Sequence, residues 1–138
     1  MKKRIAAILI AALLLLCSCQ KNGADIQKTE DDFQNDGQFS ADFIDVGQGD
    51  SILICSNGHS MLIDAGTNES GKTVLNFLKD KGIEKLDYAV GTHPHADHIG
   101  GLDDVIRGID TDCLLMPNAV TDTKTFNDVL DAAESKGL

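Results

Sequence analysis

The stretch GTHPHADHIGG (Gly91–Gly101) contains three of the four histidines of the chain, with an aspartate between the second and the third. His93 and His95 are separated by one residue, so their side chains point to the same side of an extended segment. Pro94 favours that conformation, because a residue before proline is kept out of the helical region. Imidazole nitrogen with carboxylate oxygen is a ligand set that zinc prefers, and iron or manganese would also accept it. We therefore predict a metal site formed by His93, His95, Asp97 and His98.

The setting of this cluster also favours a binding site. A strand is predicted to lead into it, and histidines at the carboxyl end of a strand lie where α/β sheets usually bind ligands. Gly100 and Gly101 follow, and their lack of side chains lets backbone segments pass close to the site. The alternative is a loop of ordinary surface histidines, which does not explain why three of them gather in one short segment.

The rest of the chain predicts an α/β domain over residues 39–138. Three short apolar runs precede the cluster and are separated by Gly-Gln-Gly and Asn-Gly, which predicts an antiparallel meander. After them the apolar residues take up helical spacing, and strands and helices then alternate. The order β-β-β-α-β-α-β-α predicts layers of sheet and helices. The predicted strands are 39–46, 50–56, 59–65, 86–92 and 112–116, and the predicted helices are 71–81, 102–109 and 126–133.

The N-terminus combines a basic start with an unbroken apolar run, Ile5–Leu16. A membrane-spanning helix needs about 20 apolar residues, so this shorter run predicts a signal peptide over residues 1–18. The segment LCSC resembles the bacterial lipobox, in which a small residue precedes the cysteine that receives lipid. Cys19 fits because Ser18 precedes it. We predict an extracytoplasmic protein that lipid on Cys19 anchors to the bacterial cell membrane; the alternative is an ordinary signal peptide with incidental cysteines.

Composition constrains the partners of the protein. Residues 19–38 are polar and acidic and cannot bury enough apolar surface to offset their ordering entropy, which predicts a flexible tether. The chain has 22 acidic and 12 basic side chains and a formal charge of −10. So acidic a surface repels nucleic acid and anionic headgroups, and an anionic substrate would need the local attraction of a metal. Cys55 and Cys113 lie in apolar surroundings, which favours two buried free thiols over a disulfide.

Three segments resemble one known family. HPHADH (His93–His98) resembles the H-x-H-x-D-H signature of the metallo-β-lactamase superfamily, and MLIDAG (Met61–Gly66) resembles its preceding strand and aspartate. FIDVGQGDSILI (Phe43–Ile54) is similar to one branch, the extracellular hydrolase domain of the competence protein ComEC and related secreted or lipid-anchored hydrolases. The resemblance runs from about Phe39 to the end of the chain. It implies an αββα sandwich with a dinuclear metal site, of which this chain resembles the N-terminal half.

The resemblance also implies roles for individual residues. His93 and His95 would bind the first of two divalent ions, most simply zinc, and Asp97 and His98 the second. Asp64 would brace the metal loop, with an aspartate that only turns the end of its strand as the alternative. The implied reaction is hydrolysis of a small-molecule or nucleic-acid phosphodiester by a metal-activated hydroxide that Asp97 orients.

Some positions do not match the family. His59 matches no family ligand and is interpreted as a solvated turn histidine, and Gly47–Gly49 as a turn near the site. The family completes its centre with later histidines and an acid, whereas no histidine follows His98 here. We therefore expect a fragment or a truncated gene product that is almost inactive alone.

Other functions are weighed against the hydrolase. The alternative is a non-catalytic metal-binding or interaction module, and the nucleotide sequence after the codon of Leu138 would discriminate between the two. A solute-binding lipoprotein would leave the histidines unexplained, and β-lactam hydrolysis belongs to another branch.

Overall fold

The computed structural model describes residues 38–119 and 121–138. The predicted signal peptide, the lipidation site Cys19 and the predicted tether up to residue 37 lie outside the described residues. The strands are β1 (Phe39–Phe43), β2 (Ile52–Ser56), β3 (His59–Ile63), β4 (Lys85–Leu86), β5 (Tyr88–Val90), β6 (Asp110–Thr111) and β7 (Leu114–Leu115). The helices are α2 (Gly71–Asp80), α3 (Ala96–Ile99), α4 (Leu102–Gly108) and α5 (Lys124–Lys136).

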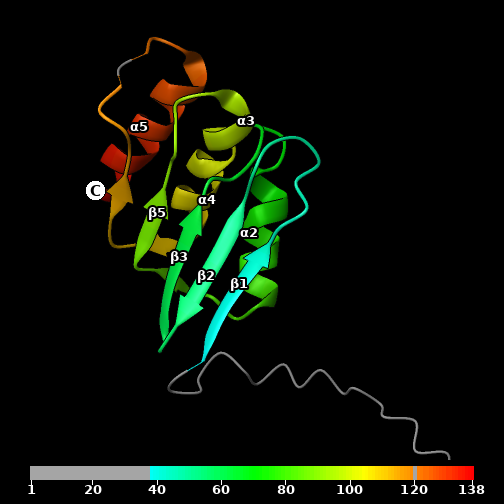
Figure 1. Ribbon diagram of the computed structural model, residues 1–138. Helices are drawn as coiled ribbons and strands as arrows, with labels where there is room; N and C mark the ends of the chain where they lie inside the picture. The colour runs from blue at the N-terminus through cyan, green and yellow to red at the C-terminus, as the bar shows by residue number, and fades with distance from the viewer. Residues whose placement is uncertain (1–37, 120) are drawn as a thin grey trace, which may run out of the picture.

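The main sheet has five strands in the order β1-β2-β3-β5-β7 (Figure 1). β1, β2 and β3 pair antiparallel, which confirms the predicted meander. β5 pairs parallel with β3, and β7 pairs parallel with β5. The mixed sheet and its helices confirm the α/β class. Because β3 and β5 are parallel neighbours, their carboxyl ends meet at the same edge of the sheet.

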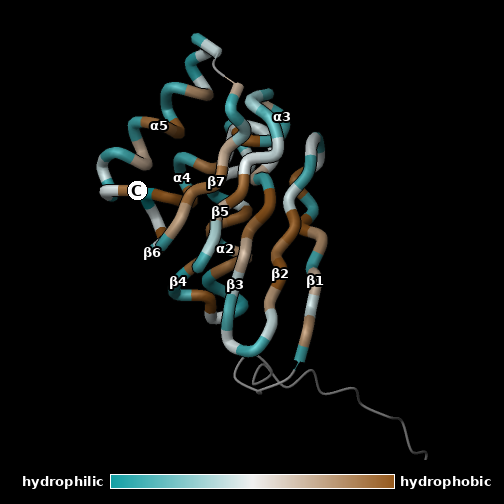
Figure 2. The backbone as a smooth tube through the Cα atoms, turned by 60° about the vertical axis from the view of Figure 1, so that its left-hand side comes forward, coloured by the Kyte–Doolittle hydropathy of each residue, from teal (hydrophilic) through white to brown (hydrophobic). Residues whose placement is uncertain are grey.

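The hydrophobic core lies between one face of the sheet and the helices. Leu53 of β2 and Leu62 of β3 are fully buried there, and they pack in one cluster with apolar residues of α2, α4 and α5. Strand residues alternate between faces, so the neighbours of these leucines point to the other side. In Figure 2 the central strands are the hydrophobic ones, whereas the helices alternate between hydrophobic and hydrophilic residues.

The second face of the main sheet is apolar and open. Phe39 and Phe43 of β1 are 70% and 80% exposed, and Tyr88 and Leu115 are each 46% exposed. Their strand positions alternate with the buried ones, so the pattern that builds the core also builds this second apolar surface. It is the side on which a second layer of sheet would pack in a sandwich.

All five predicted strands are shorter than expected, and for two of them the contacts give the reason. The segment predicted as strand 50–56 pairs only from Ile52, because Asp50 and Ser51 contact the end of β3 instead. The segment predicted as one strand, 86–92, is divided at Asp87. The Asp87 carboxylate accepts hydrogen bonds from the Ser60 amide and from His59, and this turns Lys85–Leu86 away to pair with β6 in a second, small sheet.

The helices begin and end where local sequence signals lie. Thr123 caps α5 by accepting a hydrogen bond from the Phe126 amide, and Gly137 ends that helix in the left-handed conformation. The predicted helix 102–109 corresponds to α4. The one-turn helix α3 comes before it, so Asp97 and His98 lie within a helix of their own.

Both remaining cysteines are free thiols, as predicted, but only Cys55 is buried; Cys113 is partly exposed, which corrects the prediction for that residue. Removal of the Cys55 thiol from water raises its pKa to about 11, with a smaller contribution from the nearby charge of Asp42. Cys55 is therefore an inert core residue at neutral pH.

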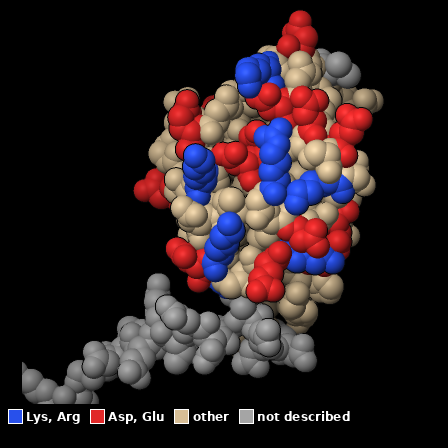
Figure 3. Space-filling model, turned by 180° about the vertical axis from the view of Figure 1, so that it is seen from behind, with Lys and Arg blue, Asp and Glu red and all other residues tan. Residues whose placement is uncertain are grey.

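The surface behind the sheet mixes charges of both signs. Figure 3 shows acidic and basic side chains interspersed over this face, rather than a continuous basic stretch of the kind that nucleic acid favours. Along the described part of the chain, no helix has the length and apolar character needed to cross a membrane.

Candidate metal centre

The candidate site lies at the edge where β3 and β5 end. β3 is followed directly by Asp64, whose amide donates to the carbonyl of Val90 in β5 across 2.8 Å. Asp64 adopts a left-handed conformation, with φ of 56°. Aspartate tolerates this region better than most residues, and such conformations cluster at functional sites. The parallel pairing thus brings Asp64 beside the segment that follows β5.

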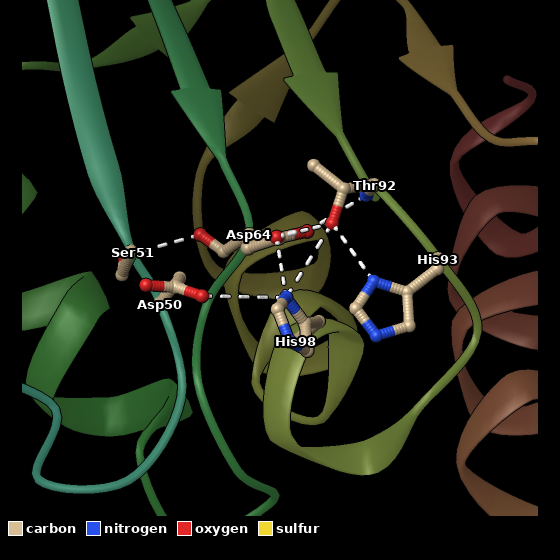
Figure 4. A network of polar contacts seen from close by, with 6 residues as sticks. All are labelled: Asp50, Ser51, Asp64, Thr92, His93 and His98. Carbon is tan, nitrogen blue, oxygen red and sulfur yellow. Dashed lines mark hydrogen bonds and ion pairs between the residues drawn. The ribbon is translucent and has the colours of Figure 1, made fainter.

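Asp64 is almost fully buried, at 2% exposure, and its carboxylate joins two parts of the metal loop (Figure 4). Its Oδ1 accepts from the Thr92 amide at 2.8 Å, and its Oδ2 accepts from the Thr92 hydroxyl at 2.6 Å. His98 Nδ1 lies 2.8 Å from the same Oδ2. A buried carboxylate needs such donors to offset its desolvation, so Asp64 fixes both the start of the loop and the imidazole of His98.

These hydrogen bonds determine which nitrogen each imidazole presents. When His98 donates Nδ1–H to Asp64, its Nε2 keeps a free lone pair. The hydroxyl oxygen of Thr92, having donated its proton to Asp64, can accept from Nδ1 of His93 at 3.2 Å. Histidine ligands of metals are commonly held by a carboxylate or another acceptor on the second nitrogen in this way.

The structure brings three of the four predicted ligands together. His93, Asp97 and His98 each offer a donor atom, and these atoms lie within 4.8 Å of one another. The rings of His93 and His98 are 3.7 Å apart between centroids. His95 is more exposed and lies outside this group, although its ring meets that of His93 edge to face at 4.8 Å. The backbone is extended at His95 but bends over residues 92–94, so the predicted extended segment is present only in part, and the edge-to-face contact is what places the His93 and His95 rings together.

The donor set fits a divalent metal ion. The ligand atoms around a tetrahedral zinc ion lie about 3.4 Å apart, given zinc–ligand distances of about 2.1 Å. The three donors are within 4.8 Å, so small side-chain rotations would close them around an ion. Neutral imidazoles and a carboxylate suit zinc, iron or manganese. The division of four ligands between two ions remains a prediction.

Close backbone packing holds the loop in place. A Cβ on Gly49, whose φ is 92°, would lie only 1.7 Å from the carbonyl oxygen of Asp97. A Cβ on Gly100 would lie 2.4 Å from the amide nitrogen of Asn68. Only glycine permits both approaches. The Gly47–Gly49 turn is therefore packed directly against the metal loop. The sequence predicts a turn near the site, and the structure places it in contact with the site.

Two residues of the site were missed in the sequence. Thr92 stands directly before His93, and Asp50 ends the Gly-Gln-Gly turn, with its Oδ2 3.7 Å from His98 Nδ1. Asp50 lies within a segment that carries the family resemblance and Thr92 directly precedes another, but nothing local indicates that they face the cluster. His59 lies at the other end of β3, and it is 75% exposed and bonded to Asp87 at 2.8 Å, which agrees with its interpretation as a solvated histidine.

The fold and this site together define a class of protein, the α/β domains whose candidate metal ligands follow a strand at one edge of a mixed sheet. The family model for the metallo-beta-lactamase superfamily matches residues 44–112, half of the chain. The chain belongs to this superfamily, and the matched segment includes all four predicted ligands and Asp64.

Comparison with individual proteins narrows the relationship. The ComE operon protein 3 of Bacillus subtilis is 30% identical over 115 residues, which cover 70% of this chain and 15% of that protein. Recombination protein 2 of Haemophilus influenzae is 31% identical over 85 residues, covering 58% of this chain and 11% of that protein. The chain thus spans less than a fifth of the length of these relatives, and it matches the ComEC-like branch over part of its length.

Among solved structures, a match is again partial. The subclass B3 metallo-beta-lactamase MEM-A1, from a soil metagenome library, is 28% identical, with a TM-score of 0.47. The match covers 56% of this chain and 32% of that one.

Proposed function

We propose that this chain carries the H-x-H-x-D-H part of the metal centre of a phosphodiester hydrolase that is anchored outside the bacterial cytoplasm by lipid on Cys19. The observation that carries the proposal is the grouping of His93, Asp97 and His98 at the shared edge of β3 and β5, braced by the buried Asp64. Surface histidines without a function would not need a carboxylate at 2% exposure behind them.

The substrate class rests on charge and on the relatives. An acidic chain with a formal charge of −10 favours an anionic substrate only where bound cations attract it. Recombination protein 2 is named for a process that concerns nucleic acid, which favours a nucleic-acid or nucleotide phosphodiester. The mixed charges in Figure 3 favour binding of the substrate at the sheet edge where β3 and β5 end, rather than on the surface behind the sheet.

The residues of the site have separate tasks in this reaction. Bound divalent ions, most simply two zinc ions, would polarise the phosphoryl oxygen and make water more acidic. Asp64 holds Nδ1 of His98 and so directs Nε2 toward the site. Thr92 does the same for His93 through its hydroxyl. The carboxylate of Asp97 lies close to these imidazoles. There it can bind a metal ion and orient the attacking water.

Turnover of a generic phosphodiester such as bis(4-nitrophenyl) phosphate tests this function. Catalytic zinc usually has about three protein ligands, whereas His93, His95, Asp97 and His98 give two donors for each of two ions. We expect the chain from Gln20 to Leu138 to hydrolyse the ester at a rate close to that of the free metal ion. A longer protein that contains this chain and the later family ligands should turn over.

The acidic residue at the centre provides the matched comparison. In the longer protein, Asp97→Ala should lower kcat at least about 100-fold, whereas the exposed Asp131→Asn should not, because only Asp97 reaches the metal and the water. If the longer wild-type protein binds metal but does not hydrolyse the ester, the result would favour the non-catalytic module. Strong chelator-sensitive turnover by residues 20–138 would show that the ligand count is wrong.

The membrane anchor has its own test. Cys19→Ser should release the protein or leave its precursor uncleaved, whereas Cys17→Ser should change neither, because Leu16 is too large for the position before a lipidated cysteine. One acyl chain binds a membrane only marginally, so stable retention should reflect more than one chain. Fractionation and mass spectrometry of the N-terminal peptide measure both. Wild-type protein that is fully soluble, with an unmodified Cys19, would contradict the anchor.

A further inference from the structure

Asp50 is a second carboxylate beside His98. Its Oδ2 lies 3.7 Å from Nδ1 of His98, the same nitrogen that donates a hydrogen bond to Asp64 (Figure 4). The two acids come from different loops: Asp64 follows β3, and Asp50 precedes β2. Asp64 is buried, whereas the side chain of Asp50 is 66% exposed. His98 itself is only 17% exposed, so its imidazole lies between these acids and the rest of the loop.

The backbone of Asp50 is fixed on the site from two directions. Its carbonyl accepts a hydrogen bond of 2.9 Å from the Gly66 amide, next to the end of β3. The next residue, Ser51, donates its hydroxyl to the carbonyl of Asp64 at 3.1 Å. The preceding residue, Gly49, lies against the carbonyl of Asp97. Asp50 is therefore held between the end of β3, which Asp64 follows, and the helix α3, which supplies Asp97 and His98.

The distances assign different roles to the two carboxylates. At 2.8 Å, Asp64 makes a direct hydrogen bond to His98, but 3.7 Å is too long for one. Asp50 can therefore act on the imidazole through its charge. When an imidazole gives its lone pair to a divalent cation, its Nδ1–H becomes more positive, and a nearby negative charge stabilises that state.

We propose that Asp50 is a positioning residue of the metal centre, a carboxylate that the Gly47–Gly49 turn sets beside His98 to strengthen metal binding by charge. The inference rests on the proposed metal site at His93, Asp97 and His98. It adds to that site a function for the glycine turn, which would deliver Asp50 without ligating the ion.

Zinc affinity of the chain from Gln20 tests this role. The core cluster lies between Ile44 and Ala132, so this protein retains all of it. We measure affinity by competition with a chromophoric chelator. Asp50→Asn keeps the shape and the backbone contacts but removes the charge, and it should weaken zinc binding about 3–5-fold, the range of an exposed charge interaction. Asp50→Glu should restore most of the affinity, because the charge returns.

Three comparisons distinguish an electrostatic role of Asp50 from a structural role. The thermal unfolding midpoint of the metal-free Asp50→Asn protein should equal that of the wild type. The difference in affinity should shrink at 1 M NaCl, where the screening length falls to about 3 Å. Asp131→Asn, which removes an exposed charge from α5, should leave affinity unchanged.

The outcomes distinguish this inference from the proposed function. Equal affinities of the Asp50→Asn and Asp131→Asn proteins, with zinc bound by both, would overturn the role of Asp50 alone. A loss of affinity that persists undiminished at 1 M NaCl would also overturn it. A wild-type protein that binds no zinc would contradict the metal site and this inference together.

Discussion

Replacing His93 and His98 together by alanine should remove zinc binding from the protein. The two imidazoles are two of the three donors that lie within 4.8 Å of one another, and Asp97 alone would remain. Loss of a residue that only supports a ligand already lowers affinity about 10–100-fold, so loss of two ligands should lower it more than about 100-fold. Zinc content after gel filtration, with chelator competition for the affinity, measures the effect.

His59→Ala is the matched control for this experiment. His59 is the first residue of β3, is 75% exposed, bonds Asp87 and lies at the opposite end of the strand from Asp64. The His59→Ala protein should bind zinc with the affinity of the wild type. Equal zinc content in the wild type and the His93→Ala/His98→Ala protein would exclude the cluster as the site.

The single variant His95→Ala adds information about the arrangement. If one ion binds the group of three, this variant should retain most of the affinity, because His95 lies outside that group. If His93 and His95 hold one ion and Asp97 and His98 another, it should lose one of two bound ions. The number of zinc ions per chain therefore decides between the two arrangements.

Asp64→Ala should cause the largest loss of stability among the site variants. The change removes three hydrogen bonds to a buried carboxylate and leaves the Thr92 amide without its partner. It also places alanine at φ of 56°. Together these should cost about 3–5 kcal/mol, a large share of the roughly 5–15 kcal/mol of a typical domain. Urea unfolding of the metal-free protein measures the loss.

Asp64→Asn separates the parts of this effect. Asparagine tolerates the left-handed conformation and keeps the shape of the side chain, so this variant should fold with a smaller loss of stability. It lacks the negative charge that holds His98 Nδ1, and zinc affinity should fall about 10–100-fold. An Asp64→Ala protein with the unfolding midpoint of the wild type would show that the carboxylate does not support the loop.

The open apolar face of the sheet bears on all of these measurements. Phe39, Phe43, Tyr88 and Leu115 are exposed on it, and apolar patches of this kind favour association. Unfolding and binding should therefore be compared at several protein concentrations, so that self-association is not mistaken for an effect at the metal centre.

Much of the fold follows from local sequence. Asn57-Gly58 predicts the hairpin between β2 and β3, and both residues have positive φ there. The spacing of Val74 and Leu78 predicts α2, and both are fully buried. The strand around Ala89 is predicted in place but not in length, because Asp87 bonds back to Ser60 and divides it. Such a bend depends on a partner 27 residues away, which periodicity does not reveal.

The metal cluster itself is a property of the sequence. His93, His95, Asp97 and His98 are so close along the chain that a strand ending before a helix must keep them near one another. Pro94 keeps His93 out of the helical region, and the short helix α3 begins only after His95, whose backbone is extended. The kinds of ligand, and hence the preference for zinc or a similar ion, require no knowledge of distant contacts.

Tertiary structure alone decides what supports the cluster. Asp64 reaches Thr92 and His98 across 28 and 34 residues, because the chain crosses through α2 and returns to place β5 parallel to β3. The pairing of β2 with β3 and the contacts after it bring Asp50 to His98, and His95 lies outside the group of three. Sequence spacing encodes neighbours within one element, whereas these contacts depend on which strands pair, and pairing is determined by burial of the whole sheet face.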